Sequence, residues 1–203
     1  MSASQSSPRI QRNQEPPRFY FAHRNYLKFL LVDFKNRCGY SCQHMNRLGG
    51  LGGLEVDHFN PQLKQPQRNR YENLILSSRH CNGKKGAKWE SPERQKIGFR
   101  FIDPTKETDY GVHIFEDPNT NELWGATPTG VYQIRHLDLN ADHLVRERKR
   151  RSELAKLKLK PGIVTSKKSD PEVKKGIDSF NRELEEMIPI LPQKTRPLRP
   201  WEH

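Results

Sequence analysis

Hydrophobic residues recur at different periods along the chain, and each change of period marks a new segment. Over residues 23–37, Leu27, Leu30, Leu31 and Phe34 have the spacing of one apolar helix stripe, which we expect to pack in the core. The glycines of RLGGLGG then break any helix. Short apolar runs in LEVDHFNP and YENLILSS predict two strands, and RHCNGKKGAKW predicts a short basic helix.

The second half of the chain predicts a small antiparallel β-unit. Alternating apolar residues in GVHIFEDPNTNELWG, with a turn signal at DPNTN, indicate a hairpin, and VYQIRHLDLN predicts one more strand. Asn140 or Asp142 can cap a following basic helix. A last helix over 171–188 begins at a proline and carries a short heptad seam. That seam either covers the chain's own β-unit or pairs with a second copy or another protein.

These patterns predict an α+β protein with a defined order of parts. We expect a disordered tail (1–17), a core (18–94), a small β-unit (95–140), a basic helix (141–160), a linker with the C-terminal helix (161–190) and a proline-rich tail (191–203).

Charge and cysteine content restrict the partners and the compartment. The 203 residues carry a formal net charge of +12, which favours a polyanionic partner such as nucleic acid. The longest apolar run, residues 29–32, is far too short to span a bilayer, and residues 1–17 have no apolar signal region. Three cysteines do not form a disulfide framework, so we expect a reducing, cytoplasmic location.

The segment 55–85 contains the residue types that phosphodiester hydrolysis needs. His58 follows Asp57 at the predicted end of a strand, Asn73 opens the second strand, and Asn82 lies in the basic helix. A histidine can activate water, and carboxylate and amide oxygens suit Mg²⁺ or Mn²⁺. Adjacent strand residues point to opposite faces, so the strand must end or bulge for Asp57 and His58 to serve one site.

The ordered set D-H-x-x-P, N-L and C-N-x-x-K within these residues resembles the HNH endonuclease family, in a form found in bacteria. The resemblance implies a ββα-metal core, which the N-terminal helix, the β-unit and the C-terminal helices would extend. It implies His58 as the general base, Asn73 as the residue that orients this base and braces the loop, and Asp57 and Asn82 as ligands of one divalent metal. It also implies a phosphate contact from Lys85, with Lys84 beside it.

Several expectations follow for substrate and partners. Basic residues of the following helix would clamp the backbone of DNA, most simply double-stranded: Arg146, Arg148, Lys149, Arg150 and Arg151. One centre cuts one strand at a time, and defence against foreign DNA is one role the resemblance suggests. A non-catalytic nucleic-acid-binding protein and an RNA-directed nuclease or toxin are the alternatives. We expect no structural zinc, because Cys38-Gly-Tyr-Ser-Cys42 is one residue too long for a C-x-x-C pair, and Ser78 replaces a cysteine before Cys81.

Overall fold

A computed structural model describes residues 8–156 and 191–197 as a mixed α+β fold. The expected helix over 171–188 lies outside the described residues. Within them, no helix combines the length and the apolar character that a membrane span requires. The elements are η1 (His23–Tyr26), α1 (Leu27–Asp33), η2 (Met45–Arg47), η3 (Leu51–Gly53), β1 (Leu54–His58), η4 (Gln67–Asn69), η5 (Tyr71–Asn73), β2 (Leu74–Ser78), α2 (Arg79–Lys85), α3 (Pro92–Lys96), β3 (Ile114–Glu116), β4 (Leu123–Gly125), α4 (Pro128–His136) and α5 (Asp142–Lys156).

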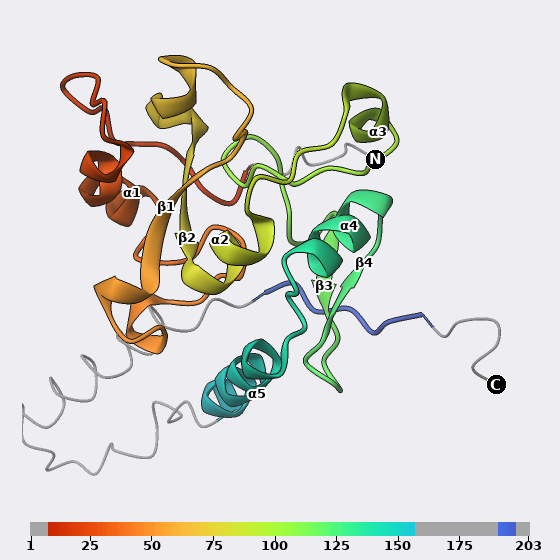
Figure 1. Ribbon diagram of the computed structural model, residues 1–203. Coiled ribbons are helices and arrows are strands. Elements are labelled where there is room, and N and C mark those ends of the chain that lie inside the picture. The colour runs from red at the N-terminus through yellow and green to blue at the C-terminus, as the bar shows by residue number, and fades with distance from the viewer. Residues whose placement is uncertain (1–7, 157–190, 198–203) are drawn as a thin grey trace, which may run out of the picture.

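The first half of the molecule is built around the antiparallel pair of β1 and β2, in which Asp57 lies opposite Ile75. Helix α1 lies on one side of this hairpin and α2 on the other (Figure 1). The predicted stripe is confirmed, because Leu30 and Phe34 are buried and Leu27 and Leu31 pack against them. The helix is shorter than the predicted range, since its first turn is a 3-10 turn and the chain leaves helical geometry soon after Asp33. The strand pair and α2 lie where the sequence predicts them.

The second half contains the predicted hairpin, β3 and β4, but VYQIRHLDLN does not form a strand. Most of that segment belongs to α4, which packs on β4. Thr127 caps the helix by accepting a hydrogen bond from the Gly130 amide, and Pro128 occupies the first turn. The prediction was wrong because the β-branched and aromatic residues outweighed this cap signal. Gly130 is needed for the close packing, since a Cβ there would lie 2.0 Å from the backbone oxygen of His113.

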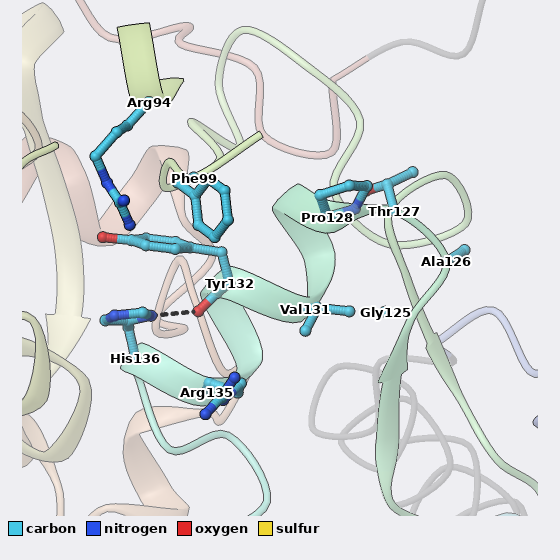
Figure 2. A pocket seen from close by; sticks show the side chains of 10 residues that line it. All are labelled: Arg94, Phe99, Gly125, Ala126, Thr127, Pro128, Val131, Tyr132, Arg135 and His136. Carbon is cyan, nitrogen blue, oxygen red and sulfur yellow. Dashed lines mark hydrogen bonds between the residues drawn. The ribbon is translucent and has the colours of Figure 1, made fainter. Parts of the chain in front are cut away.

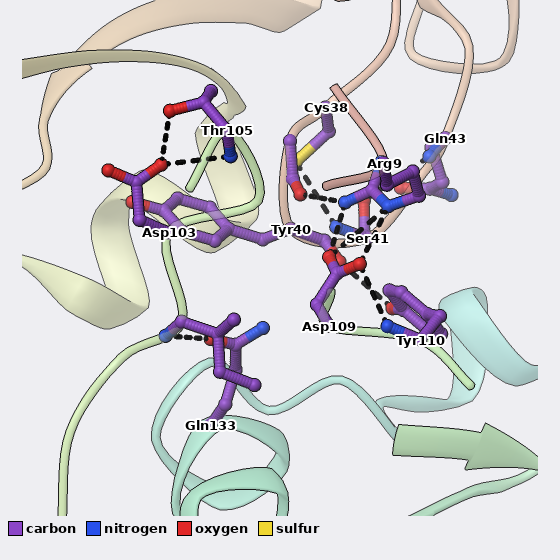
Figure 3. A network of polar contacts seen from close by, with 12 residues as sticks. Arg9, Cys38, Tyr40, Ser41, Gln43, Asp103, Thr105, Asp109, Tyr110 and Gln133 are labelled. Carbon is purple, nitrogen blue, oxygen red and sulfur yellow. Dashed lines mark hydrogen bonds and ion pairs between the residues drawn. The ribbon is translucent and has the colours of Figure 1, made fainter. Parts of the chain in front are cut away.

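The N-terminal residues 8–17 connect the two halves, which corrects their assignment to a disordered tail. Ile10 is buried, and Arg9 donates to both carboxylate oxygens of Asp109 at 2.5–3.2 Å and to the Gly39 carbonyl at 2.5 Å. Nearby, the Tyr110 hydroxyl donates to the backbone oxygen of Tyr40 at 2.9 Å. Figure 3 shows these polar contacts between the N-terminal segment, the turn before β1 and the loop before β3.

Helix α5 and the described C-terminal residues complete this connection. Arg47 and Glu147 form a two-point ion pair, at 2.8 and 3.1 Å, that ties α5 to η2. Arg151 on the same helix forms an ion pair with the buried Glu116 of β3. Residues 191–197 run beside β3, where Gln193 pairs with Glu116 in parallel orientation. Residues far apart in the sequence therefore connect the second half of the molecule to the first half, which contains the β1–β2 hairpin.

Candidate active site

The two faces of β1 carry different groups. Glu55 and Asp57 contact residues of α2, whereas His58 contacts residues of η1 and η4 on the opposite side. This division follows from the two-residue period of a strand. His58 is the last residue of the strand and still pairs with Leu74, so Asp57 and His58 keep the opposite faces of regular strand geometry.

His58 is half buried and is held by a residue that the sequence pattern did not single out. Its Nε2 lies 2.7 Å from the side-chain oxygen of Asn69, and the amide nitrogen of Asn69 donates to the Phe21 carbonyl. The His23 ring lies against it, with ring centroids 4.6 Å apart. Burial lowers the pKa of His58, and the positive charges of Arg68 and Lys85 add to this, while the bond to Asn69 opposes it. A histidine with a lowered pKa is neutral near pH 7, which is the state a general base needs.

Asn73 braces the long loop between the strands. Its oxygen accepts from the Asn60 amide at 3.0 Å, and its nitrogen donates to the carbonyls of Asn60 and Arg68 at 3.1 and 2.9 Å. The side-chain bond to the His58 ring comes from Asn69, so any influence of Asn73 on the base passes through the loop.

Asp57 is buried and bonded through both of its oxygens. The Tyr40 hydroxyl donates to Oδ2 at 2.7 Å, and Lys85 Nζ donates to Oδ1 at 3.1 Å. Burial raises the pKa of Asp57 and lowers the pKa of Lys85, and their mutual attraction opposes both changes. Lys85 is fully buried and also donates to the His58 carbonyl, at 2.7 Å. This corrects the expected phosphate contact of Lys85, because its ammonium group faces the interior.

Asn82 lies beside Glu55, a carboxylate that the sequence reasoning missed. The amide nitrogen of Asn82 donates to Glu55 at 2.6 Å, and Arg79 lies 3.5 Å from the other carboxylate oxygen. The Glu55 side chain is 40% exposed, whereas Asp57 is 5% exposed. The available signal was the strand period, since Glu55 stands two positions before Asp57 and therefore shares its face.

The β1–α2 face offers oxygen donors of the kind that hard cations prefer. Two carboxylates and one amide oxygen are the chemistry that Mg²⁺ or Mn²⁺ selects. Among the described residues, there is no group of three or more histidine, cysteine and acidic side chains that could hold a metal ion. The oxygen-bearing side chains of this face are Glu55, Asp57 and Asn82, and both oxygens of Asp57 are bonded to Tyr40 and Lys85.

The predicted phosphate-binding cations divide into exposed and buried groups. Lys84 is exposed and pairs with Asp138 at 2.8 Å. On α5, Arg146, Lys149 and Arg150 are exposed and share one helix face, at positions i, i+3 and i+4. Arg148 is buried and donates to the carbonyls of Asn121 and Leu139, and Arg151 pairs with Glu116. Arg148 is thus a structural residue here, which corrects its expected role.

The three cysteines are buried and free. The Cys38 thiol is in hydrogen-bond contact with Cys81, and Ser41 and Ser78 surround the pair. Ser41 donates its amide hydrogen to the Cys38 sulfur at 3.4 Å, and Ser78 accepts from the Cys81 amide at 3.3 Å. Burial opposes ionisation of Cys38, but the bonds from Cys81 and Ser41 lower its pKa. Two sulfurs and two hydroxyls therefore occupy this corner of the hairpin.

A hollow of about 760 Å³ lies elsewhere, against α4. Figure 2 shows the stacked rings of Tyr132 and His136, whose centroids are 3.9 Å apart, with Arg94 and Phe99 above them. None of the side chains predicted for catalysis or metal binding lines this hollow.

Comparison with known families agrees with the ββα arrangement. Residues 36–88 match the family model described as HNH endonuclease, so the chain contains an HNH domain. The match covers β1, β2 and α2 with the loop between the strands. It supports a role as a nuclease or in nucleic-acid binding. No curated protein and no solved structure matches the chain.

Proposed function

We propose that this chain is a metal-dependent nuclease that hydrolyses phosphodiester bonds in DNA, with His58 as the general base. The observation that carries the proposal is the state of the His58 ring. It lies in the segment that matches the HNH model and is half buried, and among the described contacts Nε2 is the ring nitrogen that makes a hydrogen bond. One ring nitrogen is thereby fixed, and the other remains for proton transfer.

In the proposed reaction, the unprotonated nitrogen of His58 accepts a proton from a water molecule. The water oxygen forms a bond to phosphorus, and the bond from phosphorus to the leaving sugar oxygen breaks. That oxygen departs with the electron pair and takes a proton from solvent. Holding the ring at the end of β1 keeps the base in one orientation, which reduces the entropy lost on reaching the transition state.

A divalent cation, when bound, supplies neutralisation of the charge that develops on the phosphate oxygens. Asp57 and Asn82 would hold it, with Glu55 as a further oxygen donor. Lys85 links the two functions because it binds the Asp57 carboxylate and the His58 carbonyl. Lys85 therefore fixes the position of the Asp57 carboxylate relative to the backbone of His58.

Double-stranded DNA is the proposed substrate, contacted by the exposed face of α5 and by Lys84. Arg146, Lys149 and Arg150 point away from the body of the protein, opposite the buried Leu144 and Arg148. Such cations neutralise phosphates and release counterions with little regard for sequence. Three free thiols suit the proposed cytoplasmic location, where the enzyme would degrade foreign DNA in antiviral defence.

One observation favours a second candidate, a nucleic-acid-binding protein on the same scaffold. Both oxygens of Asp57 are bonded, to Tyr40 and Lys85, and Asn82 is bonded to Glu55. A protein that only binds DNA has no need to keep these donors open for a metal ion.

Cleavage assays separate the candidates. Plasmid DNA and RNA are incubated with wild type, His58→Ala and the control His143→Ala, each with Mg²⁺, Mn²⁺ or EDTA. We expect nicking by wild type and control, loss with EDTA, and a rate about 10²–10⁴-fold lower for His58→Ala with DNA affinity near wild type. Binding without cleavage by wild type would support the second candidate. Cleavage of RNA alone would identify an RNA-directed nuclease.

A further inference from the structure

Asn69, at the end of η4, is 6% exposed and bonded at both ends of its side-chain amide. One end contacts the backbone oxygen of Phe21, and the other contacts Nε2 of His58 at 2.7 Å. A carbonyl oxygen can only accept, so the end facing Phe21 must be the NH₂ group. The amide oxygen therefore faces His58, and this orientation follows from the backbone contact alone.

This orientation determines the tautomer of His58. An amide oxygen can only accept, so Nε2 must carry the hydrogen. A neutral imidazole has a single N–H group, and Nδ1 is therefore the nitrogen with a free lone pair. We propose that Asn69 is a positioning residue that holds His58 in its Nε2–H form, so that Nδ1 is the atom that takes the proton from water. This inference rests on the proposed function for its catalytic part.

The loop that carries Asn69 is itself held in place. The backbone N–H of Asn69 donates to the Pro66 carbonyl at 3.1 Å. The side-chain nitrogen of Asn73 donates to the carbonyl of the neighbouring Arg68 at 2.9 Å. Asn73 thus acts on the base at one remove, because it fixes the loop that presents Asn69. This chain of contacts connects the middle asparagine of the motif to the histidine without a direct bond between their side chains.

The chemical nature of Asn69 also suits the task. Other groups near His58 are His23, whose ring packs against it, and the positive charges of Arg68 and Lys85. A neutral amide accepts one hydrogen bond and adds no charge to this set. Aspartate at the same position would still accept from Nε2, whereas alanine would leave that nitrogen without its acceptor.

Nuclear magnetic resonance of the full chain tests the tautomer directly. Protein with ¹⁵N-labelled histidine is studied by two-bond ¹H–¹⁵N correlation at a pH where the imidazoles are neutral, and His58 is assigned by its absence in His58→Ala. We expect the Nε2–H pattern in wild type, its retention in Asn69→Asp and in the control Asn46→Ala, and a mixture of tautomers in Asn69→Ala. A wild-type His58 in the Nδ1–H form overturns the inference, and this readout does not depend on whether Asn69→Ala folds.

Kinetics test the catalytic part. We expect Asn69→Ala to lower kcat about 10²-fold with KM and DNA affinity little changed, and Asn69→Asp to recover most of the rate. Wild-type kcat in Asn69→Ala overturns the positioning role. If the tautomer depends on residue 69 but wild type cleaves no nucleic acid, the proposed function fails while the assignment of the tautomer stands.

Discussion

Lys85 and Asp57 form a buried ion pair, with Nζ 3.1 Å from the carboxylate and both side chains almost fully withdrawn from solvent. The same ammonium group donates to the His58 carbonyl at 2.7 Å. A lysine that the motif implies as a phosphate contact is therefore part of the interior here. This gives the closing lysine of the motif a structural role that can be measured.

We expect Lys85→Ala to lower the free energy of unfolding by about 3–5 kcal/mol, because it leaves the buried Asp57 carboxylate without its counter-charge. Lys84→Ala is the matched control. Its pair with Asp138 is exposed, and its loss should cost less than about 1 kcal/mol. Urea denaturation of both variants provides the measurement. Equal effects at the two positions would show that Lys85 is not the buried partner of Asp57.

The metal proposal predicts which side chains control cation affinity. In a His58→Ala background, which removes turnover, Mn²⁺ binding is measured by calorimetry. We expect Asn82→Ala, Asp57→Asn and Glu55→Gln each to weaken binding by about 10-fold or more, because each removes or neutralises an oxygen donor. Glu93→Gln, at an exposed carboxylate on α3, should bind as the parent does. Unchanged affinity in Asn82→Ala would rule out the proposed ligand set.

We predict that the purified chain holds no structural zinc, since a zinc site wants four nitrogen or sulfur ligands and this corner supplies Cys38 and Cys81 with two serines. Elemental analysis after extensive dialysis gives the direct reading. The double variant Ser41→Cys, Ser78→Cys should acquire about one zinc per chain, because it completes a set of four sulfurs. Tightly held zinc in the wild-type chain would contradict the prediction.

Asp117 predicts an acid-dependent loss of stability. Its carboxylate accepts from the amides of Arg196, Asn119 and Thr120 at 2.8–3.1 Å, and these bonds, the one from Arg196 first, lower the pKa of Asp117. A lowered folded-state pKa means that the contribution is present above about pH 4, the ordinary aspartate range, and is lost as the pH falls through the lower folded value. Thermal melts from pH 7 to pH 2 should therefore show a smaller acid decline in Asp117→Asn. Parallel declines in both proteins would contradict this.

The exposed face of α5 predicts a salt-dependent contribution to DNA affinity. The triple variant Arg146→Ala, Lys149→Ala, Arg150→Ala should bind double-stranded DNA more weakly and reduce the slope of log affinity against log salt by up to about 3. The control variant, Lys96→Ala, Lys106→Ala and Arg135→Ala, removes three exposed cations elsewhere. Its net charge therefore equals that of the α5 triple variant. If the control weakens binding equally, net charge and not the α5 face determines affinity.

Much of the hairpin and α2 could be predicted because local pattern and final structure agree there. The apolar runs, the turn signals and the spacing of Asp57, His58, Asn73 and Asn82 all lie within one short stretch. Helix α4 was missed because residues with high strand propensity form it, and its cap at Thr127 and Pro128 is a short signal.

Other parts of the site depend on contacts between distant residues, which periodicity does not reveal. Asn69 contacts His58, which is eleven residues away in the sequence, and Phe21, which is 48 residues away. Arg9 reaches Asp109 across 100 positions. The separation of exposed from buried cations on α5 likewise depends on what packs against the helix. From the charge of the segment alone, Arg148 and Arg150 were both predicted to bind the DNA backbone.

Residues 191–197 have a consequence for how the protein behaves in a crowded solution. The outer edge of β3 would otherwise present unpaired backbone donors and acceptors to any passing strand, which is how sheets recruit one another into aggregates. Here Glu116 exchanges backbone bonds with Pro192 and Lys194, and the Trp124 indole donates to the Lys194 carbonyl at 2.7 Å. The chain thus closes its own sheet edge with a late segment. Removal of this segment would expose the backbone groups of that edge again and favour pairing with a strand of another molecule.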